Sequence, residues 1–394
     1  MSAGAVEGAV LTLNAGSSSL KVALYPATGE RPLATGIVDR IGPDGVLRLK
    51  DAAGGDIARP GDLSSHAGAL QSVLDSLRAA FPGLSLAAIG HRVVHGGARH
   101  AAPVRIDAAI LAELEALAPF APLHQPHNLA GIHAAMAAFP GVPQVACFDT
   151  AFHRNHPWVN DTFALPREMY ERGVRRYGFH GLSYDYIAGE LARIAPGLAA
   201  GRVVVAHLGN GASACAIQNG RSVASTMGFS ALDGLPMGTR CGQLDPGVML
   251  WMMDQGMSAP EISDLLYKRS GLLGLSGISN DMRALEASDA PEAAQAIDYF
   301  VFRLQREIGG LAASMGGIDA LVFSGGIGEN SALIRARVCE RMGWMGIEID
   351  HARNASNARV VSSELARTTV MVIPTDEEAV IARAARAAAG TAPF

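Results

Sequence analysis

The stretch LTLNAGSSSLKVALY, residues 11–25, contains two apolar runs separated by a short polar turn. The turn, residues 14–19, consists of small and polar residues, and Lys21 follows it closely. Glycine, serine and a nearby lysine are typical of phosphate sites, but the spacing differs from the P-loop motif G-x-x-x-x-G-K-[ST]. In a P-loop the glycines lead into a helix, whereas here the turn leads into a second apolar run. The stretch therefore predicts a β-hairpin with Asn14 at its first bend.

The same outline occurs a second time in the chain. Residues 205–217, VAHLGNGASACAI, again form an apolar run, a glycine-rich turn and a second apolar run. The two turns, residues 14–18 and 209–213, follow the patterns N-x-G-x-S and G-x-G-x-S. A later segment, ALVFSGGIGENSALIR at residues 320–335, holds a strand-like run, a glycine-rich turn and the start of a helix. The repeated hairpin predicts an internal duplication, with two related halves and a cleft between them.

Apolar periodicity in the first half predicts an α/β architecture. Residues 30–60 continue the hairpin with short strand-like runs, and residues 62–81 place apolar side chains at helical spacing after a serine cap. Two further apolar runs, residues 86–97 and 142–152, end in polar residues, as buried strands that open onto loops do. Helical segments are expected at 105–118 and 127–139. This alternation favours a partly parallel sheet, whose ligands collect at the carboxyl ends of the strands.

Composition limits the classes of function. The chain has 394 residues, of which 49% are hydrophobic and 18% charged, and its net charge is −5. This length corresponds to about two domains. We expect no nucleic acid as a partner, because binding to a phosphate backbone needs a basic face. No run reaches the about 18 apolar residues of a membrane span, and the N-terminus lacks a leader pattern, so we expect no membrane association.

The cysteines and the basic residues add two expectations. Four cysteines stand far apart without a C-x-x-C pair, which predicts buried thiols in a reducing cytoplasm rather than a disulfide framework or a zinc knuckle. Lysine occurs only at Lys21, Lys50 and Lys268, so arginine supplies nearly all of the positive charge. If the protein handles phosphate or carboxylate, its fork-shaped guanidinium groups are expected to bind these anions.

Several short motifs place polar side chains where a site can form. They are Arg92 in HRVVHGG (91–97), Asp149 in CFDTAFH (147–153), His180 in YGFHGLS (177–183), Arg240 in LPMGTRCGQLDPG (235–247), and Asp281 and Arg283 in SNDMR (279–283). Successive backbone N–H groups in small-residue turns form concave anion sites, so the turns at 14–19, 207–213 and 325–330 are candidates to hold phosphates. A zinc site at His91 and His95 is disfavoured, since their spacing in a strand-like run does not build a shared helix face.

Two segments predict local structure around candidate residues. The segment APLHQPHN, residues 121–128, holds His124 and His127 between prolines, which predicts a rigid loop. The segment IPTDEEAVIARAARA, residues 373–387, predicts a C-terminal helix that begins with a capping box of Thr375 and Glu378. For Glu377 and Glu378, a stabilising role in the first helical turn and a metal-binding role both remain open.

Taken together, the motifs resemble the acetate kinase family, whose order they follow from about residue 10 to residue 385. They are VLTLNAGSSSLK, GHRVVHGG, PLHQPHN, FDTAFH, YGFHGLS, VVAHLGNGAS, MGTRCGQLDPG, SGGIGEN and IPTDEE. The resemblance implies an α/β fold of two duplicated ribonuclease-H-like domains, of the actin, Hsp70 and sugar-kinase ATPase type, with a central cleft. We expect residues 1–150 with 380–394 to form the N-terminal domain and residues 151–379 to form the nucleotide-binding one.

The resemblance also implies substrates, cofactors and partners. The reaction would be the reversible phosphorylation of acetate by ATP to acetyl phosphate and ADP, with Mg2+ bound and Mn2+ able to substitute. A cytoplasmic homodimer is implied as well.

The resemblance assigns roles to the residues at matching positions. Asn14 and Glu377 would hold the metal ion. The catalytic residues would be Arg92 as binder of the substrate anion, Asp149 as the acidic residue, His124, and His180 and Arg240 as stabilisers of the transition state. The nucleotide site would consist of Lys21 at the hairpin flank, His207, Leu208, Gly209, Asn210, Gly211, Asp281, Met282, Arg283, Gly326, Ile327, Gly328, Glu329 and Asn330. The substrate methyl group would contact Val94, Leu123, Phe179 and Ala231.

Some positions depart from the family pattern. Ala231 stands where proline is common, Tyr184 where histidine is, Gln125 where asparagine is, and Cys241 where serine is. A smaller pocket wall at Ala231 would admit propionate, because one methylene discriminates by only ~1–3 kcal/mol. The retained Val94 favours acetate.

Three functions are therefore weighed. Acetate kinase is the expected function, and the alternative is a propionate kinase or a broad short-chain carboxylate kinase. A nucleotide-gated switch of the Hsp70 or actin kind is disfavoured, because it would have no use for Arg92, His124, His180 and Arg240 around a small anion.

Overall fold

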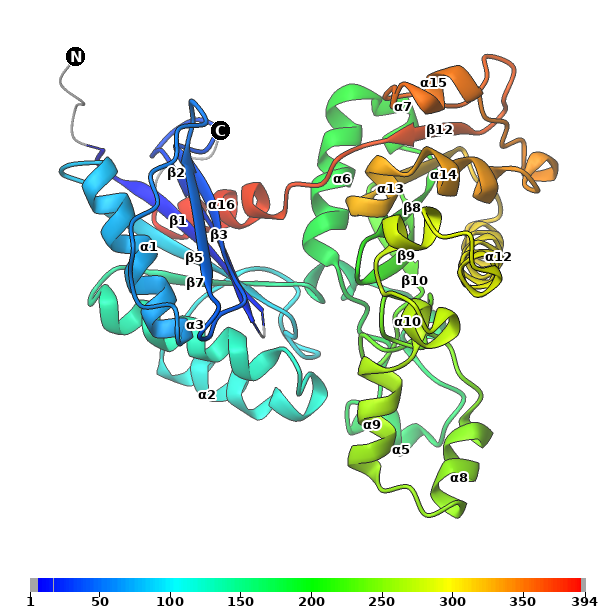
Figure 1. Ribbon diagram of the computed structural model, residues 1–394, viewed down its shortest axis with the longest axis horizontal. Coiled ribbons are helices and arrows are strands. Elements are labelled where there is room, and N and C mark those ends of the chain that lie inside the picture. Colours follow the sequence, from blue (N-terminus) through cyan, green and yellow to red (C-terminus); the bar gives the residue numbers. More distant parts are fainter. Residues whose placement is uncertain (1–5, 17, 391–394) are drawn as a thin grey trace. The chain divides into compact units, whose positions relative to one another are not determined.

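The computed structural model describes residues 6–16 and 18–390, and the chain separates into two compact units. The first unit holds the residues up to Arg154 together with those from Asp376 onward, and the second runs from Asn155 to Thr375. Ser17, in the middle of the predicted N-terminal turn, lies outside the described residues. Figure 1 shows that each unit consists of a β-sheet with helices packed on it.

A mixed sheet of seven strands forms the centre of the described part of the first unit. Its strands are β1 (Ala9–Ala15), β2 (Ser19–Tyr25), β3 (Ala34–Asp39), β4 (Val46–Asp51), β5 (Leu86–Val93), β6 (Val104–Arg105) and β7 (Gln144–Phe148). Their order in the sheet is β4-β3-β2-β1-β5-β7-β6. Strands β1 to β4 form an antiparallel meander, whereas β5 runs parallel to β1 and β7 parallel to β5. The predicted N-terminal hairpin is thus confirmed as β1 and β2.

The helices of the first unit follow the apolar periodicity of the sequence. They are α1 (His66–Ala80), α2 (Ala108–Ala116), α3 (Gln125–Ala138) and α16 (Glu377–Ala388), with the short 3-10 helices η1 (Ala118–Phe120) and η2 (Ala151–His153). Helix α1 begins after Ser65, whose side chain accepts a hydrogen bond of 3.1 Å from the Gly68 N–H. The predicted serine cap is therefore present and satisfies one of the free N–H groups of the first turn.

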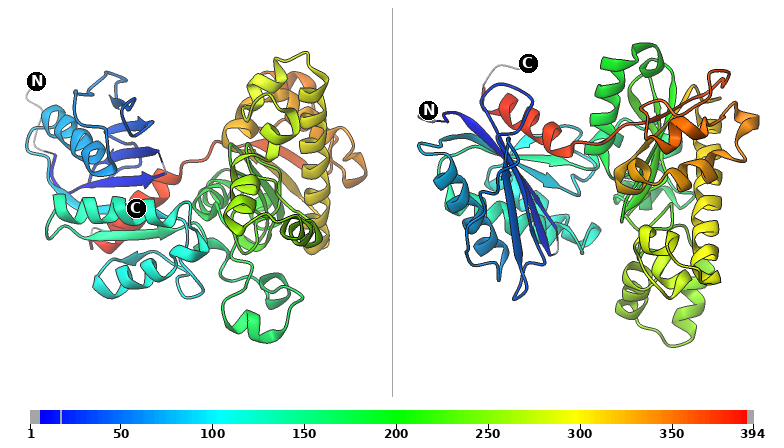
Figure 2. Two further views of the ribbon diagram at one scale, coloured as in Figure 1. Left: turned by 60° about the horizontal axis from the view of Figure 1, so that its bottom comes forward. Right: turned by 45° about the horizontal axis from the view of Figure 1, so that its top comes forward.

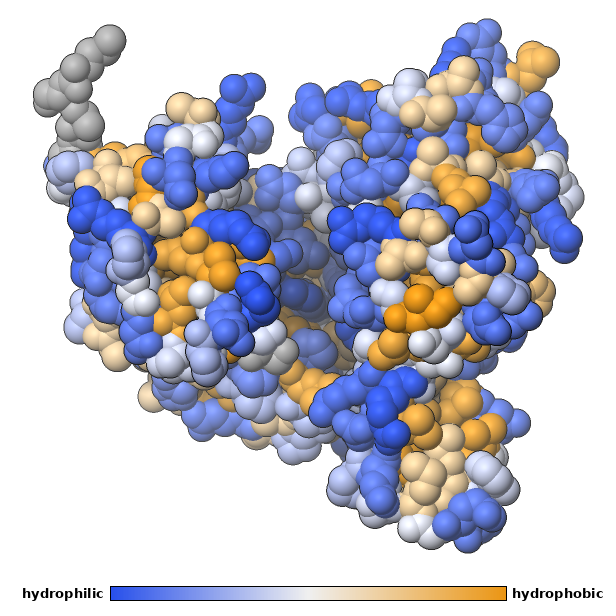
Figure 3. Space-filling model, in the orientation of Figure 1, coloured by the Kyte–Doolittle hydropathy of each residue, from blue (hydrophilic) through white to orange (hydrophobic). Residues whose placement is uncertain are grey.

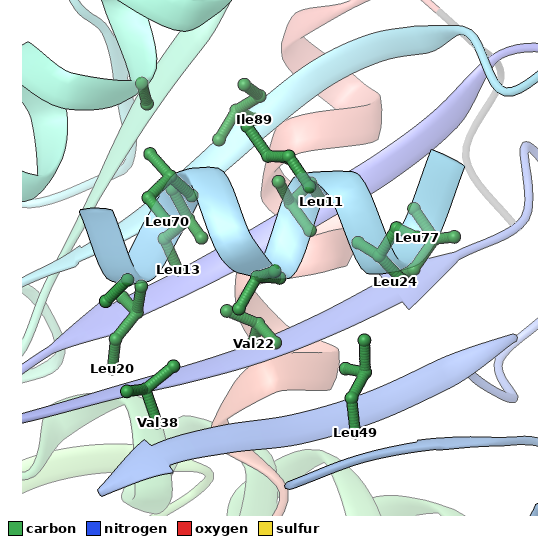
Figure 4. Close-up of a cluster of buried hydrophobic side chains, with 14 of the residues drawn as sticks. Leu11, Leu13, Leu20, Val22, Leu24, Val38, Leu49, Leu70, Leu77 and Ile89 are labelled. Atoms are coloured by element: carbon green, nitrogen blue, oxygen red, sulfur yellow. The ribbon is translucent and has the colours of Figure 1, made fainter. Parts of the chain in front are cut away.

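Side-chain alternation along β1 decides which helix covers which face of the sheet. Leu11 and Leu13 are buried in a cluster with Leu70 and Leu77 of α1, as Figure 4 shows. The opposite face of β1 carries Thr12 and Asn14, because successive side chains of a strand point to opposite sides.

Helix α16 covers that opposite face. On β5, Gly90 pairs in register with Thr12, and a Cβ atom at Gly90 would lie 2.4 Å from Cγ2 of Ile381 in α16. Only glycine allows the helix to approach the strand so closely. Asn14 therefore lies on the side of the sheet that α16 packs against.

The described part of the second unit is built on a mixed sheet of five strands. They are β8 (Arg202–Leu208), β9 (Ala212–Gln218), β10 (Arg221–Ser225), β11 (Ala320–Ser324) and β12 (Thr369–Val372), in the order β10-β9-β8-β11-β12. Strands β8 to β10 form an antiparallel meander, β11 runs parallel to β8 and β12 parallel to β11. The first unit contains the same arrangement as β3-β2-β1-β5-β7. The predicted duplication and the α/β fold class are confirmed.

Helices cover most of the second unit. They are α4 (Trp158–Asp161), α5 (Arg167–Glu171), α6 (Gly181–Ile194), α7 (Pro196–Ala199), α8 (Pro246–Asp254), α9 (Ala259–Lys268), α10 (Gly271–Ser276), α11 (Met282–Glu286), α12 (Pro291–Ser314), α13 (Gly325–Asn330), α14 (Ala332–Cys339), η3 (Gly343–Met345) and α15 (His351–Ala355). The long helix α12, yellow in Figure 2, packs against β8, β9 and β10. Within the described ranges, no helix is long and apolar enough to cross a membrane.

Helix α8 has no buried residue over its nine residues. Leu250 is 63% exposed and Trp251 is 61% exposed. Figure 3 shows apolar residues at the surface of the part of the second unit that contains α8 and α9.

Two local predictions are wrong. The C-terminal helix is capped by Asp376, which accepts a hydrogen bond of 2.9 Å from the Ala379 N–H, and not by a box of Thr375 and Glu378. The N–H of Thr375 instead bonds the Glu329 carboxylate at 3.2 Å, so Thr375 ends the preceding segment. The segment APLHQPHN is a turn only over residues 121–124, because Gln125 starts α3 with Pro126 in its first turn and His127 inside it. Proline is well accommodated there, since the first helical N–H groups have no partner within the helix.

Candidate active site

Strand register brings Asn14, Arg92 and Asp149 to the same edge of the first sheet. Leu13 of β1 pairs with His91 of β5, and Arg92 pairs with Cys147 of β7. Asn14 therefore lies beside Arg92, and Asp149, two residues after Cys147, projects to the same face. The edge is the one at which the parallel strands β1, β5 and β7 have their carboxyl ends, as the sequence predicted for the site.

Arg92 is the centre of this cluster. Its Nε donates to Asp149 Oδ1 at 3.0 Å and its Nη2 to Asp149 Oδ2 at 2.6 Å, which is a bidentate pair. Its Nη1 donates to Asn14 Oδ1 at 3.2 Å, and its Nε lies 3.9 Å from Glu377 Oε2 at the start of α16. Asp149 is buried at 1% exposure, and the Arg92 cation bonds both oxygens of its carboxylate.

The electrostatics of the cluster keep Arg92 charged. Burial alone would lower the pKa of Arg92, but the charges of Asp149 and Glu377 outweigh burial and raise this pKa above its ordinary value. Burial, followed by the neighbouring charge of Glu377, raises the pKa of Glu378, and the charge of Lys21 acts in the opposite direction. The edge of the sheet thus holds a permanent cation among carboxylates.

Helix α3 holds the strand ends in place through two buried amides. Asn128 donates from Nδ2 to the Ala15 carbonyl at 2.7 Å and accepts from the Val94 N–H at 3.0 Å, so it links the end of β1 to the end of β5. Gln125 donates to the His95 carbonyl at 3.1 Å and accepts from the His95 N–H at 3.3 Å. Asn128 closes the motif PLHQPHN but was not among the predicted site residues.

In the second unit, α6 attaches to the β8–β9 hairpin through a set of polar contacts. His180, Ser183 and Tyr184 share one helical face, and His207 and Ser213 are cross-strand partners whose side chains also share a face. His180 Nδ1 lies 2.8 Å from Ser213 Oγ, Tyr184 OH lies 2.5 Å from the same oxygen, and Ser183 Oγ lies 2.8 Å from His207 Nδ1. The rings of His180 and His207 stack with centroids 4.4 Å apart.

Arg240 reaches the turn of the same hairpin. Its Nη1 donates to the Ala231 carbonyl at 2.8 Å, which directs the guanidinium. A Cβ atom at Gly211 would lie 3.2 Å from Arg240 Nη2 and 3.2 Å from His180 Nε2. Glycine at this position therefore lets the Arg240 guanidinium and the His180 Nε2 converge on the backbone of the turn, which is an arrangement suited to an anion.

A cavity of about 750 Å³ opens beside this turn. Its lining includes residues that the sequence assigned to nucleotide, namely Gly209, Asn210, Asp281, Met282, Arg283, Gly326, Ile327 and Asn330. Asn280, Glu286 and Ser331 also line it and were not predicted. Each is on or beside a predicted motif, and Ser331 donates to Glu286 Oε1 at 2.5 Å. The volume lies within the range of about 300–1,000 Å³ typical of small-molecule sites.

The other residues assigned to nucleotide lie outside this lining. His207, Leu208 and Gly211 belong to the hairpin, and Lys21 is in the first unit, paired across the hairpin with Asn14. The Glu329 carboxylate accepts from the Gly325 N–H at 2.8 Å and from the Thr375 N–H, so it binds the backbone of its own unit. The carbonyls of Gly328 and Glu329 accept from Arg335 at 2.9 and 3.0 Å.

The residues expected around the substrate methyl group belong to both units. In the first unit, Val94 is 4% exposed just after β5, and Leu123 and His124 immediately precede α3. In the second unit, Phe179 is 2% exposed just before α6, and the Ala231 carbonyl is the acceptor for Arg240.

Histidine and cysteine give no metal centre in the part of the chain that the structure describes. No group of three or more His, Cys, Asp or Glu residues is arranged there to hold a metal ion. His91 instead bonds Gln144 Oε1 at 2.7 Å, and burial lowers the pKa of His91 to about 4.

Comparison with known proteins identifies the relatives of this arrangement. The chain matches the acetokinase family over residues 9–383. It is 59% identical to an acetate kinase of Methylocella silvestris over 388 residues. The aligned region covers 95% of this chain and 96% of the relative. Its fold is similar to the crystal structure of an acetate kinase of Porphyromonas gingivalis, with 39% identity, a TM-score of 0.87, and coverage of 96% of this chain and 98% of that one. A propionate kinase of Francisella tularensis has 37% identity, a TM-score of 0.90 and the same coverage.

Proposed function

Because the chain belongs to the acetokinase family, whose members are carboxyl-group phosphotransferases that use ATP and ADP, we propose that it phosphorylates acetate reversibly by direct in-line transfer. The resemblance predicted from the motifs is thereby confirmed. The observation that carries the proposal is the bidentate Arg92–Asp149 pair, joined by Asn14 and Glu377 at the carboxyl ends of β1, β5 and β7.

The chemistry of a carboxylate nucleophile agrees with this cluster. A carboxylic acid with a pKa near the about 4.3 of a Glu side chain is already ionised at neutral pH, so the reaction needs no general base. Asp149 is not required as a proton acceptor, and its two contacts with Arg92 suit a positioning role. The reaction instead needs positive charge around a phosphoryl group that moves between two anions.

The oxygen atoms around Arg92 fit the magnesium ion that kinases use. Mg2+ takes carboxylate and amide oxygens and is commonly held by one or two carboxylates together with the phosphates of the substrate. Asn14 and Glu377 would hold the ion, with Mn2+ as a substitute and Asp149 close by. When bound, the ion supplies positive charge to the phosphate oxygens.

The remaining roles follow from the geometry of each unit. Arg92 would bind the substrate anion, with His124 as a further donor at the start of α3. Arg240 and the Nε2 of His180 would donate hydrogen bonds to the transferring phosphoryl group. The cavity lined by Asp281, Arg283 and Gly326 would hold the nucleotide.

The function is tested by trapping the acyl phosphate with hydroxylamine. The purified protein is incubated with ATP, Mg2+ and either acetate, propionate or butyrate, and the hydroxamate is measured. We expect product with acetate at the highest kcat/KM. The absence of product from all three acids would rule out carboxylate kinase activity.

Propionate kinase is the second candidate, since the chain is also similar to a structure with that name and carries the small Ala231. A higher kcat/KM for propionate would assign the protein to this alternative. Replacing Ala231 with proline should lower kcat/KM for propionate relative to acetate, because the added ring atoms narrow the pocket wall. The main-chain carbonyl that accepts from Arg240 is retained in this variant. An unchanged ratio would show that position 231 does not contact the acyl chain.

Asn14 and Lys21 provide a matched pair of tests on one hairpin. They are cross-strand partners, but only Asn14 contacts Arg92, whereas Lys21 is exposed. We expect Asn14→Ala to lower kcat by about 10²-fold, the scale seen on removing one positioned donor or ligand. We expect Lys21→Ala to lower it much less. Titration of Mg2+ should show a raised metal requirement for Asn14→Ala alone, and equal losses in both variants would contradict the assignment of Asn14.

The assembly and cellular place of the enzyme belong to the same proposal. We propose a homodimer, supported by the exposed apolar residues of α8, since apolar patches on a surface often mark contacts. A monomeric mass in light scattering would contradict this. We propose the cytoplasm as its location, where ATP and ADP are available. The two units would be the two ribonuclease-H-like domains.

A further inference from the structure

The contacts around His180 contain a chain of hydroxyl groups. Tyr184 OH lies 2.5 Å from Ser213 Oγ, and Ser213 Oγ lies 2.8 Å from His180 Nδ1. We propose that Tyr184 and Ser213 form a positioning relay that holds neutral His180 with its proton on Nε2, as a hydrogen-bond donor. This inference rests on the proposed role of His180 in phosphoryl transfer, which it extends to the residues behind the ring.

The Ser213 hydroxyl decides the direction of the relay. Ser213 is fully buried, so its single proton must be used within the protein. In the described part of the chain, its hydroxyl contacts the phenol of Tyr184 and the imidazole of His180. An imidazole nitrogen is a far stronger base than a phenol oxygen, so the proton of Ser213 is directed to His180 Nδ1.

Tyr184 completes the chain from the other side. Burial, above all, raises the pKa of Tyr184 well above its ordinary value, so the phenol keeps its proton. A phenol is more acidic than an alcohol and is the better donor of the two, so Tyr184 donates to the Ser213 oxygen. Linked hydrogen bonds that run in one direction strengthen one another, which makes Ser213 a better donor to His180.

The consequence lies at the far nitrogen of the ring. A neutral imidazole that accepts at Nδ1 carries its proton on Nε2. A Cβ atom at Gly211 would be 3.2 Å from this Nε2 and equally far from Arg240 Nη2. His180 therefore presents an N–H donor beside the guanidinium without adding a second full charge.

The orientation of the His180 imidazole is also fixed by its surroundings. His180 is the N-cap of α6 and has a positive φ of 57°, which is uncommon for residues other than glycine. This backbone conformation fixes the direction in which the side chain leaves the main chain. The stacked ring of His207, which Ser183 contacts at 2.8 Å, supports its face. Since the backbone and His207 already orient the His180 ring, the relay determines which ring nitrogen carries the proton.

The first measurement is the protonation state of His180 in the free protein. Long-range 1H–15N NMR spectra of histidine side chains distinguish the two tautomers and the doubly protonated ring, and the His180 signals are assigned by their loss in His180→Asn. In the wild type we expect a proton on Nε2 and a hydrogen-bonded, proton-free Nδ1. In Ser213→Ala the Nδ1 signal should move toward that of a free imine nitrogen.

The second measurement is the kinetics of matched variants. We expect Ser213→Ala to lower kcat by about 10-fold or more with little change in the KM for ATP, because a positioned hydrogen bond contributes on this scale. Tyr184→Phe should show a smaller loss in the same direction. The control is Tyr177→Phe, which removes a buried hydroxyl that donates to the Gly173 carbonyl at 2.7 Å and is not part of the relay.

These measurements separate the relay from the proposed function. A His180 ring protonated on Nδ1 in the wild type would overturn the relay, whether or not the protein makes acetyl phosphate. So would a kcat in Ser213→Ala equal to that of Tyr177→Phe. If the NMR result is as expected but no hydroxamate forms with any acid, the proposed function is wrong and the hydrogen-bond arrangement stands.

Discussion

Replacement of Arg92 by alanine is expected to lower kcat/KM for the carboxylic acid by about 10³–10⁵, the scale that one positioned arginine contributes in phosphoryl transfer. Arg92 bonds both Asp149 and Asn14. Its loss would remove the proposed anion binder and the guanidinium that bonds both oxygens of the buried Asp149 carboxylate. Binding of Mg-ATP, measured by calorimetry, should persist, because the cavity proposed for the nucleotide is lined by residues of the second unit.

Two further variants test whether the loss is specific to the guanidinium of Arg92. Arg92→Lys retains the charge but not the bidentate geometry, so we expect it to remain strongly impaired. Arg99→Ala is the matched control, since Arg99 is 74% exposed and pairs with Glu113 in the same unit. Because removal of one partner of a buried ion pair destabilises a protein, thermal unfolding of Arg92→Ala is recorded alongside. Near-wild-type turnover in a folded Arg92→Ala would remove Arg92 from the site.

Replacement of Arg240 by alanine should have an effect of similar size, about 10³–10⁵ in kcat/KM. Its guanidinium is directed by the Ala231 carbonyl and approaches Gly211 together with His180 Nε2. The variant loses charge stabilisation that is needed mainly in the transition state, so kcat should fall much more than the KM for ATP rises. Steady-state assays by hydroxamate formation, with each substrate varied in turn, separate these two effects.

The control for Arg240 is an arginine of the same unit that is held by an ordinary ion pair. Arg193 on α6 is 67% exposed and contacts Glu190 at 2.6 Å. Arg193→Ala should leave turnover unchanged. If Arg240→Ala loses less than about 10-fold, the loop of residues 235–247 is a structural element and the stabilising charge comes from elsewhere.

Much of the fold could be predicted from the sequence because it is encoded locally. Each hairpin is marked by two apolar runs around a short turn of small residues, and the structure contains both as β1–β2 and β8–β9. The polar motifs likewise predicted Asp149 at the end of a strand, and two of the residues assigned to the nucleotide, Asn210 and Gly326, line one cavity. These features depend on alternation and turn chemistry within about ten residues.

The wrong predictions have a common physical cause. Thr375 is a good capping residue by type, but its N–H is already bound by Glu329, which is distant in sequence. Asp376 therefore takes the cap of α16. Likewise, two prolines around His124 indicated a loop, but Pro126 fits the first turn of a helix that packs against the strand ends. Local rules were overridden by partners from elsewhere in the fold.

The sequence by itself determined that this protein is a duplicated α/β kinase of the acetokinase family, because short contiguous segments encode its hairpins, turns and family motifs. Only the tertiary structure decided which side chains hold the catalytic groups. Asn128 reaches the Ala15 carbonyl across 113 residues, and Tyr184 reaches Ser213 across 29. Such hydrogen bonds depend on strand register and on how a helix packs on a sheet, and no local pattern contains that information. The stretch at residues 11–25 thus identifies the fold, while contacts from β5, β7 and α3 place its Asn14 beside Arg92.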